Sequence, residues 1–150
     1  MAIPVPPFAL AGCKVLREHG FQAYLVGGAI RDSLLGFDPT DWDIVTDATP
    51  QEIESLFPRS IPTGREFGTI TVLLEDGQVE ITTMRSDGPY SDRRHPDYIT
   101  FTTELEQDLS RRDFTINALA YDPLAQNILD PFKGRRHLRR RLLVTVGDPT

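Results

Sequence analysis

Apolar residues recur every three or four positions in several segments of the chain, a spacing typical of helices that pack one face against a core. The clearest case begins after the proline pair at 6–7 and stops at Gly20. In another, a proline occupies the first turn, and Thr49 and Glu52 are spaced as in a capping box. These signals predict helices over residues 8–19, 29–35 and 49–57, and a short helical region over 108–119.

Other segments are short and partly alternating, as expected of β-strands. The pair Asp76-Gly77 lies between two of them and predicts a tight hairpin. Segment 85–97 is polar, charged and broken by a glycine and a proline, so it is predicted to be a loop. Strands are predicted over residues 22–26, 42–46, 69–74, 78–84, 98–102 and 142–146. Together these elements predict one α+β domain in which helices flank a small, mostly antiparallel mixed sheet.

The composition narrows the class of protein. A chain of 150 residues, 39% hydrophobic and 25% charged, is ordinary for one globular domain with a core. No apolar run approaches the roughly 20 residues of a membrane span, and no cationic stretch followed by an apolar one suggests a signal peptide. The single cysteine, Cys13, is expected to be a core residue and excludes an internal disulfide. We therefore expect a cytoplasmic protein without a membrane partner.

Charge is unevenly distributed along the chain. The net charge of −6 argues against nonspecific nucleic-acid binding by the whole surface. Arginine accounts for 14 of the 16 basic residues, and six basic residues lie within 133–141. Arginine suits bidentate phosphate contacts, although a solvated face explains such a cluster equally well. On a helix, Arg135 and Arg139 would share one face, with Arg136 and Arg140 beside them.

Two carboxylates one residue apart, Asp41 and Asp43, are the strongest chemical signal. Residues two apart on a strand face the same side, and such a pair of hard oxygen ligands suits magnesium together with substrate phosphate. Gly27, Gly28 and Arg31 lie just upstream, where backbone N–H groups and a guanidinium would meet a phosphate chain. Taken singly, the acid pair is typical of solvated residues and the glycines of a tight turn. In this order they indicate chemistry on a nucleoside triphosphate.

Five motifs in order carry a family resemblance. They are residues 27–36 followed by Asp41 and Asp43, then 80–85, 92–96, 111–118 and 130–134. In this order they resemble class II tRNA nucleotidyltransferases, which include CCA-adding enzymes, and bacterial poly(A) polymerases. The resemblance extends over about residues 8–150. It implies the polymerase-β-like nucleotidyltransferase fold and a catalytic head domain.

The resemblance implies that Asp41 and Asp43 hold two magnesium ions. Glu80 is the candidate third catalytic carboxylate, with an exposed strand acid as the alternative. The implied reaction is template-independent transfer of a nucleotide from CTP or ATP to an RNA 3′-hydroxyl, foremost the addition of CCA to tRNA. Partial CC or A addition, poly(A) synthesis, and a nucleotide- or RNA-binding module without turnover remain as alternatives.

The resemblance also implies a nucleotide site built from a triphosphate segment and a ribose segment. Gly27, Gly28 and Arg31 match the triphosphate segment, and Arg112, Asp113 and Asn117 match the motif associated with ribose recognition. Arg111 is a further candidate of the nucleotide site. An acid or amide can bond the ribose 2′-hydroxyl and so distinguish ribonucleotides from deoxyribonucleotides. For Asp32, pairing with a neighbouring arginine is the alternative to a role in this site. The candidate RNA contacts are Arg93, Arg94, Arg135, Arg136, Arg139 and Arg140.

The resemblance also bears on domain organisation. We expect residues 1–150 to be the head domain, with 142–150 leading toward a neck domain. The base-selecting Glu-Asp-x-x-Arg pattern of the family would follow residues 147–149, and the chain ends before it. We therefore expect a head domain that is inactive or unselective by itself. The sequence leaves open the base preference, the oligomeric state and whether the chain is a fragment or a truncated product.

Overall fold

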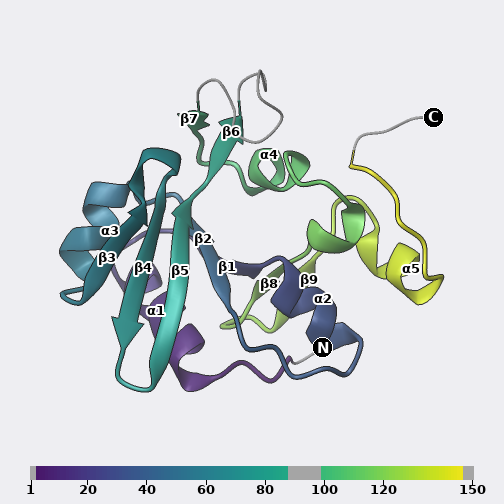
Figure 1. The fold of residues 1–150 in the computed structure, drawn as a ribbon, viewed down its shortest axis with the longest axis horizontal. Coiled ribbons are helices and arrows are strands. Elements are labelled where there is room, and N and C mark those ends of the chain that lie inside the picture. Colours follow the sequence, from purple (N-terminus) through teal and green to yellow (C-terminus); the bar gives the residue numbers. More distant parts are fainter. Residues whose placement is uncertain (1–2, 88–98, 147–150) are drawn as a thin grey trace.

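The computed structural model describes residues 3–87 and 99–146, which form an α+β fold around a seven-stranded sheet (Figure 1). The sheet has the order β3-β4-β5-β2-β1-β8-β9. Its strands are β1 Ala23–Val26, β2 Asp43–Thr46, β3 Ser60–Gly64, β4 Thr69–Leu74, β5 Gly77–Thr83, β8 Ala120–Asp122 and β9 Asn127–Leu129. Every neighbouring pair is antiparallel except β2 and β5, which are parallel. The predicted fold class is confirmed.

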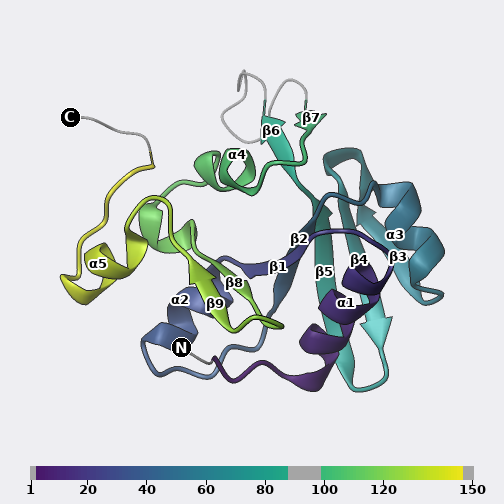
Figure 2. The ribbon, with the colours of Figure 1, turned by 180° about the vertical axis from the view of Figure 1, so that it is seen from behind.

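Helices cover the sheet unequally. They are α1 Pro7–Glu18, α2 Gly28–Leu34, α3 Pro50–Leu56, α4 Leu105–Ser110 and α5 Gly134–Arg139, with 3₁₀ turns η1 Arg65–Phe67 and η2 Thr115–Asn117. Helices α1 and α3 pack on the same face, where their apolar sides join the larger core cluster (Figure 2). A smaller cluster on the opposite face includes Leu109 of α4 and Val45 of β2. Within the described parts of the chain, no helix is long and apolar enough to cross a membrane.

The helices with strong start and stop signals are where the sequence predicts them. The Thr49 side chain caps α3, and the Thr49 backbone N–H donates to the Glu52 carboxylate at 2.9 Å, which completes a capping box. The hairpin predicted at Asp76-Gly77 joins β4 and β5. Cys13 is fully buried in α1, as expected.

The helical region predicted over 108–119 is wrong in its extent. Helix α4 stops at Ser110, and only the single turn η2 follows before strand β8 begins. The predicted strand 142–146 is instead a single antiparallel bridge between Phe114 and Thr145. The Thr115 N–H donates to the Val144 carbonyl at 2.8 Å. This long-range hydrogen bond uses an N–H group that a continuous helix would need for its own hydrogen bonds.

Three short strands of the main sheet, β3, β8 and β9, were not predicted. Two of them, β3 and β9, are the sheet edges, and β3 contains Pro62, which a central strand would not tolerate. The loop predicted over 85–97 begins as strand β6 Arg85–Asp87, which pairs with β7 Ile99–Phe101. Its remaining residues lie outside the described part of the chain.

Helix α5 is docked closely on η2, the turn that carries Asn117. The Thr115 hydroxyl and the His137 Nδ1 atom are hydrogen-bonded at 2.6 Å. Gly134, the first residue of α5, is buried, and a Cβ atom there would overlap the carbonyl group of Thr115. The absence of a side chain at this position therefore sets how closely α5 approaches the turn.

We expect Gly134→Ala to destabilise the chain, because backbone rather than a flexible side chain must yield to the added methyl group. Overpacking of this kind typically costs roughly 1–3 kcal/mol. Thermal denaturation should therefore show a loss of several degrees in Tm. Arg136→Ala, on an exposed position of the same helix, is the matched control and should change stability by less than about 0.5 kcal/mol. Equal melting temperatures for the two variants would contradict this account of α5 docking.

Candidate active site

The acidic residues singled out by the sequence are brought together by parallel pairing of two strands. Asp43 begins β2, and Glu80 lies in register with it on the neighbouring β5. The Glu80 N–H donates to the Trp42 carbonyl at 3.3 Å, and the side chain of Trp42 is buried. Asp41 immediately precedes this anchored tryptophan. Three carboxylates from two segments, about 40 residues apart, thus share one side of the sheet.

The three carboxylates line an open cavity of about 530 Å³ at the start of β2 and β5. The cavity is formed by Phe8, Thr40, Asp41, Trp42, Asp43, Gly77, Gln78 and Glu80. Asp41 and Glu80 are exposed, whereas Asp43 is half-buried. The acids therefore face a space that is accessible to a substrate.

The electrostatics of this cavity are unfavourable for negative charge. Burial is the largest cause that raises the pKa of Asp43, the neighbouring carboxylates of Glu80 and Asp41 add to the rise, and Arg112 opposes it, so that the pKa lies at about 6. A carboxylate with this environment gains from any cation that binds nearby. Among the described residues, Arg112 is the cation that opposes this rise in pKa, so added positive charge would stabilise the site.

Magnesium suits this donor set. Hard carboxylate oxygens are its preferred protein ligands, and it usually keeps waters and substrate phosphates for its other positions. Within residues 3–87 and 99–146, no three acidic, histidine or cysteine side chains converge closely enough to enclose an ion by themselves. Asp41 and Asp43 would therefore hold a metal jointly with the substrate.

Gly27 lies on the other side of Asp43 from Glu80. It follows Val26, which pairs with Asp43 across β1 and β2, and its φ of 82° is readily adopted only by glycine. A Cβ atom on Gly27 would lie 4.0 Å from the Asp43 Oδ2 atom and 3.6 Å from the Arg112 Nη1 atom. The bare backbone of Gly27 is thus flanked by a candidate metal ligand and a candidate phosphate ligand.

Arg31, Asn117 and Asp113 form a connected network. The Arg31 Nη1 atom donates to Asn117 Oδ1 at 2.8 Å, and Asn117 Nδ2 donates to Asp113 Oδ1 at 3.1 Å. The hydrogen bond from Asn117 is the largest cause that lowers the pKa of Asp113. Gly28 adjoins the same arginine, since a Cβ there would lie 3.2 Å from Arg31 Nη2. Asp32 forms an ion pair with Arg31 at 2.9 Å, as expected if it pairs with a neighbouring arginine instead of contacting the nucleotide.

Arg111 and Arg112 are held by an acid that the sequence analysis did not single out. The carboxylate of Asp108 is fully buried and contacts Arg111 Nε at 3.3 Å and Arg112 Nη2 at 3.4 Å. It also accepts the backbone N–H of Arg85 at 3.0 Å. Burial, followed by the charge of Arg111, lowers the pKa of Arg112, and Asp108 opposes both effects. The spacing of Asp108 three and four residues before the arginines on a helix was the available signal.

The candidate RNA contacts are not part of the carboxylate cavity as the structure describes it. Arg93 and Arg94 lie outside the described residues. Arg136 and Arg140 are exposed on α5 and at its C-terminal end. The helical spacing expected for this basic run is present, and Asp130 stabilises the start of the helix by accepting the N–H groups of Gly134 and Arg135.

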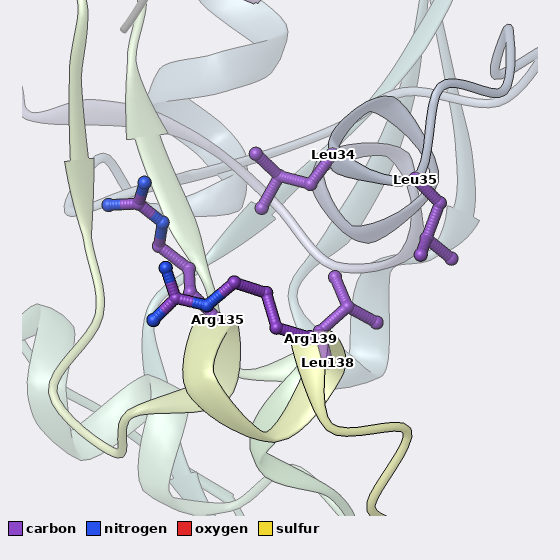
Figure 3. A pocket seen from close by; sticks show the side chains of 5 residues that line it. All are labelled: Leu34, Leu35, Arg135, Leu138 and Arg139. Carbon is purple, nitrogen blue, oxygen red and sulfur yellow. The ribbon is translucent and has the colours of Figure 1, made fainter.

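Arg135 and Arg139 line a separate groove between α2 and α5 (Figure 3). Its volume is about 190 Å³, and its other lining residues are Leu34, Leu35 and Leu138. Figure 3 shows both guanidinium groups extending from α5 to the same side, away from Leu35 and Leu138. The two arginines thus combine charge with an apolar surface, which differs from a uniformly solvated basic face.

Comparisons with known proteins point to one family. Residues 23–144 match the family described as the poly A polymerase head domain. A CCA-adding enzyme of Geobacillus kaustophilus is 49% identical over 144 residues, which are 95% of this chain and 35% of that protein. The chain thus spans about a third of the length of the curated relatives it matches.

Two solved structures are similar to the fold. The crystal structure of the Bacillus stearothermophilus CCA-adding enzyme in complex with CTP matches with a TM-score of 0.85 at 44% identity, over 95% of this chain and 34% of that one. A tRNA nucleotidyltransferase complexed with a primer tRNA and an incoming ATP analog matches with a TM-score of 0.67 at 30% identity, over 90% of this chain and 38% of that one.

The raised pKa of Asp43 leads to a prediction about stability. The folded chain keeps a proton on Asp43 up to about pH 6, whereas the unfolded chain releases it near the ordinary value of 3.8. The unfolded state therefore binds fewer protons between these values, and stability falls as the pH rises through that range. In metal-free buffer at about pH 7, Asp43→Asn should raise Tm by roughly 2–4 °C, and the gain should vanish near pH 4.

Asp122→Asn is the matched control for this measurement. It also replaces a carboxylate by an amide, but Asp122 is paired with Arg17 at 2.9 Å outside the carboxylate cavity. This control should lower Tm at neutral pH, the opposite direction from Asp43→Asn. A lower Tm for Asp43→Asn at neutral pH would refute the electrostatic account of the cavity.

Proposed function

This chain belongs to the poly(A) polymerase head domain family, and on that premise we propose that it is the catalytic head of an enzyme that adds nucleotides to the 3′ end of tRNA. The proposed reaction uses CTP and ATP to add CCA. The observation that carries the proposal is the placement of Asp43 between Glu80 on one side and the Gly27–Arg112 pair on the other. A triphosphate that lies along Gly27 would present its phosphates to both the acids and the arginine.

We propose that Asp41 and Asp43 hold two magnesium ions, with Glu80 as the third carboxylate of the site. The metals supply the positive charge that activates an RNA 3′-hydroxyl and neutralises the leaving pyrophosphate. In the transfer, the hydroxyl oxygen bonds to the α-phosphorus, its proton is released, and the bond between the α-phosphorus and its oxygen bridge to the β-phosphate breaks. The raised pKa of Asp43 supports this role, because bound cations would favour its ionised form.

The proposed triphosphate contacts are Gly27, Gly28, Arg31, Arg111 and Arg112. The motif resemblance assigns Arg112 to the ribose segment, and we propose it for the triphosphate instead because its Nη1 atom lies beside Gly27. Glycine permits close approach of the backbone, and arginine supplies charged donors in a planar arrangement. Asp113 and Asn117 are the proposed ribose contacts. Their hydrogen bond, and that of Asn117 to Arg31, would hold both polar groups in fixed orientations before the nucleotide arrives.

CCA addition is favoured over the alternatives by the named relatives, which are CCA-adding enzymes at 46–49% identity. Complexes of similar structures with CTP, and with a primer tRNA and an ATP analog, support both substrate classes. Poly(A) synthesis remains the second candidate, because the matched family model describes poly A polymerase heads. We propose that the basic residues of α5 contact RNA, along with Arg93 and Arg94.

Domain organisation and location belong to the same proposal. We take residues 1–150 as the head domain, with 142–150 leading toward a neck domain. By itself this head would bind CTP and ATP with little preference, since the residues that select the base would lie elsewhere. A cytoplasmic location fits a tRNA-processing role and a single, buried cysteine.

The proposal is tested by nucleotide transfer in a chimera that joins this chain to the remaining part of the Geobacillus kaustophilus relative. The chimera should incorporate labelled CTP and ATP into a tRNA that lacks CCA. Asp41→Ala or Asp43→Ala should reduce incorporation by at least roughly 10³-fold, because each removes a ligand of the metals. Asp38→Ala is the control, because Asp38 is an exposed acid in the loop that precedes Asp41. The chimera with this substitution should keep its nucleotide-transfer activity. Substantial nucleotide transfer by either active-site variant would contradict the assignment of Asp41 and Asp43 as metal ligands.

A second prediction concerns the ribose. If Asp113 bonds the 2′-hydroxyl, a deoxynucleotide leaves that polar group without its partner, at a cost of about 1–3 kcal/mol. In the same chimera, Asp113→Ala should therefore narrow the difference in kcat/KM between ATP and dATP by roughly tenfold or more. Asp38→Ala again serves as control. An unchanged ratio of kcat/KM between ATP and dATP would mean that residues other than Asp113 recognise the ribose.

A further inference from the structure

Asp108 is an acid buried outside the predicted site. Its side chain has no exposed surface, and it lies near the end of the short helix α4. One carboxylate oxygen accepts from Arg111 Nε and from the Arg85 backbone, while the other accepts from Arg112 Nη2 at 3.4 Å. A buried carboxylate is costly unless it is compensated in this way. Asp108 thus joins two adjacent arginines to the first residue of β6.

The contact with Asp108 determines which part of Arg112 remains for a ligand. Nη2 of Arg112 is directed to the buried acid, whereas Nη1 lies on the side of Gly27. The Nε atom is buried and has no hydrogen-bond partner within the described chain. Only 18% of the Arg112 side chain is exposed, so few other orientations are open to it. Asp108 therefore holds the Nη2 atom of the Arg112 guanidinium, and the Nη1 atom remains available for a ligand beside Gly27.

Asp108 also offsets a repulsion between like charges. Arg111 and Arg112 are consecutive, and both side chains are largely buried. Two guanidinium groups in such surroundings repel each other strongly unless an anion lies between them. Loss of the Asp108 charge would allow the arginines to separate, and Arg112 would lose the direction of its Nη1 edge.

We propose that Asp108 is a positioning residue that directs the Arg112 guanidinium at the triphosphate of the incoming nucleotide beside Gly27. This inference rests on the proposed function, because it assumes that a triphosphate occupies this position. Asp108 touches neither substrate nor metal in this proposal, and it acts entirely through Arg112. The ribose contacts at Asp113 and Asn117 lie outside this action.

The test is calorimetric titration of this chain with magnesium tripolyphosphate, CTP and dCTP, at a temperature where circular dichroism shows every variant folded. Asp108→Asn should weaken binding of all three ligands to the same extent, by roughly tenfold. The matched control is Asp122→Asn, which also removes a carboxylate paired with an arginine, in this case Arg17. The control should bind within about twofold of the wild type. A loss seen with CTP but not with tripolyphosphate would place the effect at the ribose and overturn the proposal.

A double-mutant cycle keeps the proposal testable if Asp108→Asn alone unfolds the chain. Arg112→Gln removes the repulsion as well as the phosphate contact, so Asp108→Asn/Arg112→Gln should fold. If Asp108 acts only through Arg112, the double variant should bind tripolyphosphate within about twofold of Arg112→Gln alone. A further loss of roughly tenfold in the double variant would mean an independent role for Asp108 and would overturn the proposal.

The wild-type titration separates the two levels of inference. If the wild type binds tripolyphosphate and Asp108→Asn binds it equally well, the positioning role is wrong while the proposed nucleotide site stands. If the wild type binds neither tripolyphosphate nor CTP, the nucleotide site itself fails, and the role of Asp108 fails with it.

Discussion

The parallel pairing of β2 with β5 is the constraint on which the site depends. Among the described strand pairs of the main sheet it is the single parallel one, and it requires α3, β3 and β4 to intervene along the chain. It brings Asp43 beside Glu80 and thereby brings like charges together. The same register aligns Ile44 with Ile81, both fully buried against α1 and α3. Burial of apolar side chains on one face thus offsets electrostatic repulsion on the other.

The two halves of the site differ in how their charges are compensated. On the basic side, Asp108 neutralises part of the Arg111–Arg112 pair, and Asn117 links Arg31 to Asp113. This network joins segments that are more than 80 residues apart, through the antiparallel pairing of β1 with β8. The basic side is therefore held in place by its own hydrogen bonds and ion pairs. On the acidic side, Arg112 is the one group of the described residues that favours the charged form of Asp43, so a bound cation would stabilise this side.

Local signals were sufficient for part of this architecture. The capping box of Thr49, the hairpin at Asp76-Gly77 and the two-residue spacing of the acids depend on neighbouring residues, and the structure has all three. Strand β8, through its pairing with β1, and the bridge between Phe114 and Thr145 depend on partners far away in the sequence. Periodicity carries no information about such pairings. The role of Asp108 was missed for a related reason, since a polar residue on a short helix is usually solvated, and only tertiary packing buries this one.

The arrangement also explains why an unfavourable carboxylate can persist at the centre of the sheet. Replacing Asp43 by a neutral residue would relieve the repulsion from Glu80, but it would remove the charge that a metal requires. If cations and triphosphate bind as proposed, they would stabilise the folded state and so offset the repulsion among the acids. Gly27 lies beside both groups, since a Cβ atom there would be 4.0 Å from Asp43 Oδ2 and 3.6 Å from Arg112 Nη1. Under the proposed function, the bare backbone of Gly27 lets a phosphate chain approach closely enough to contact both the acidic and the basic half of the site.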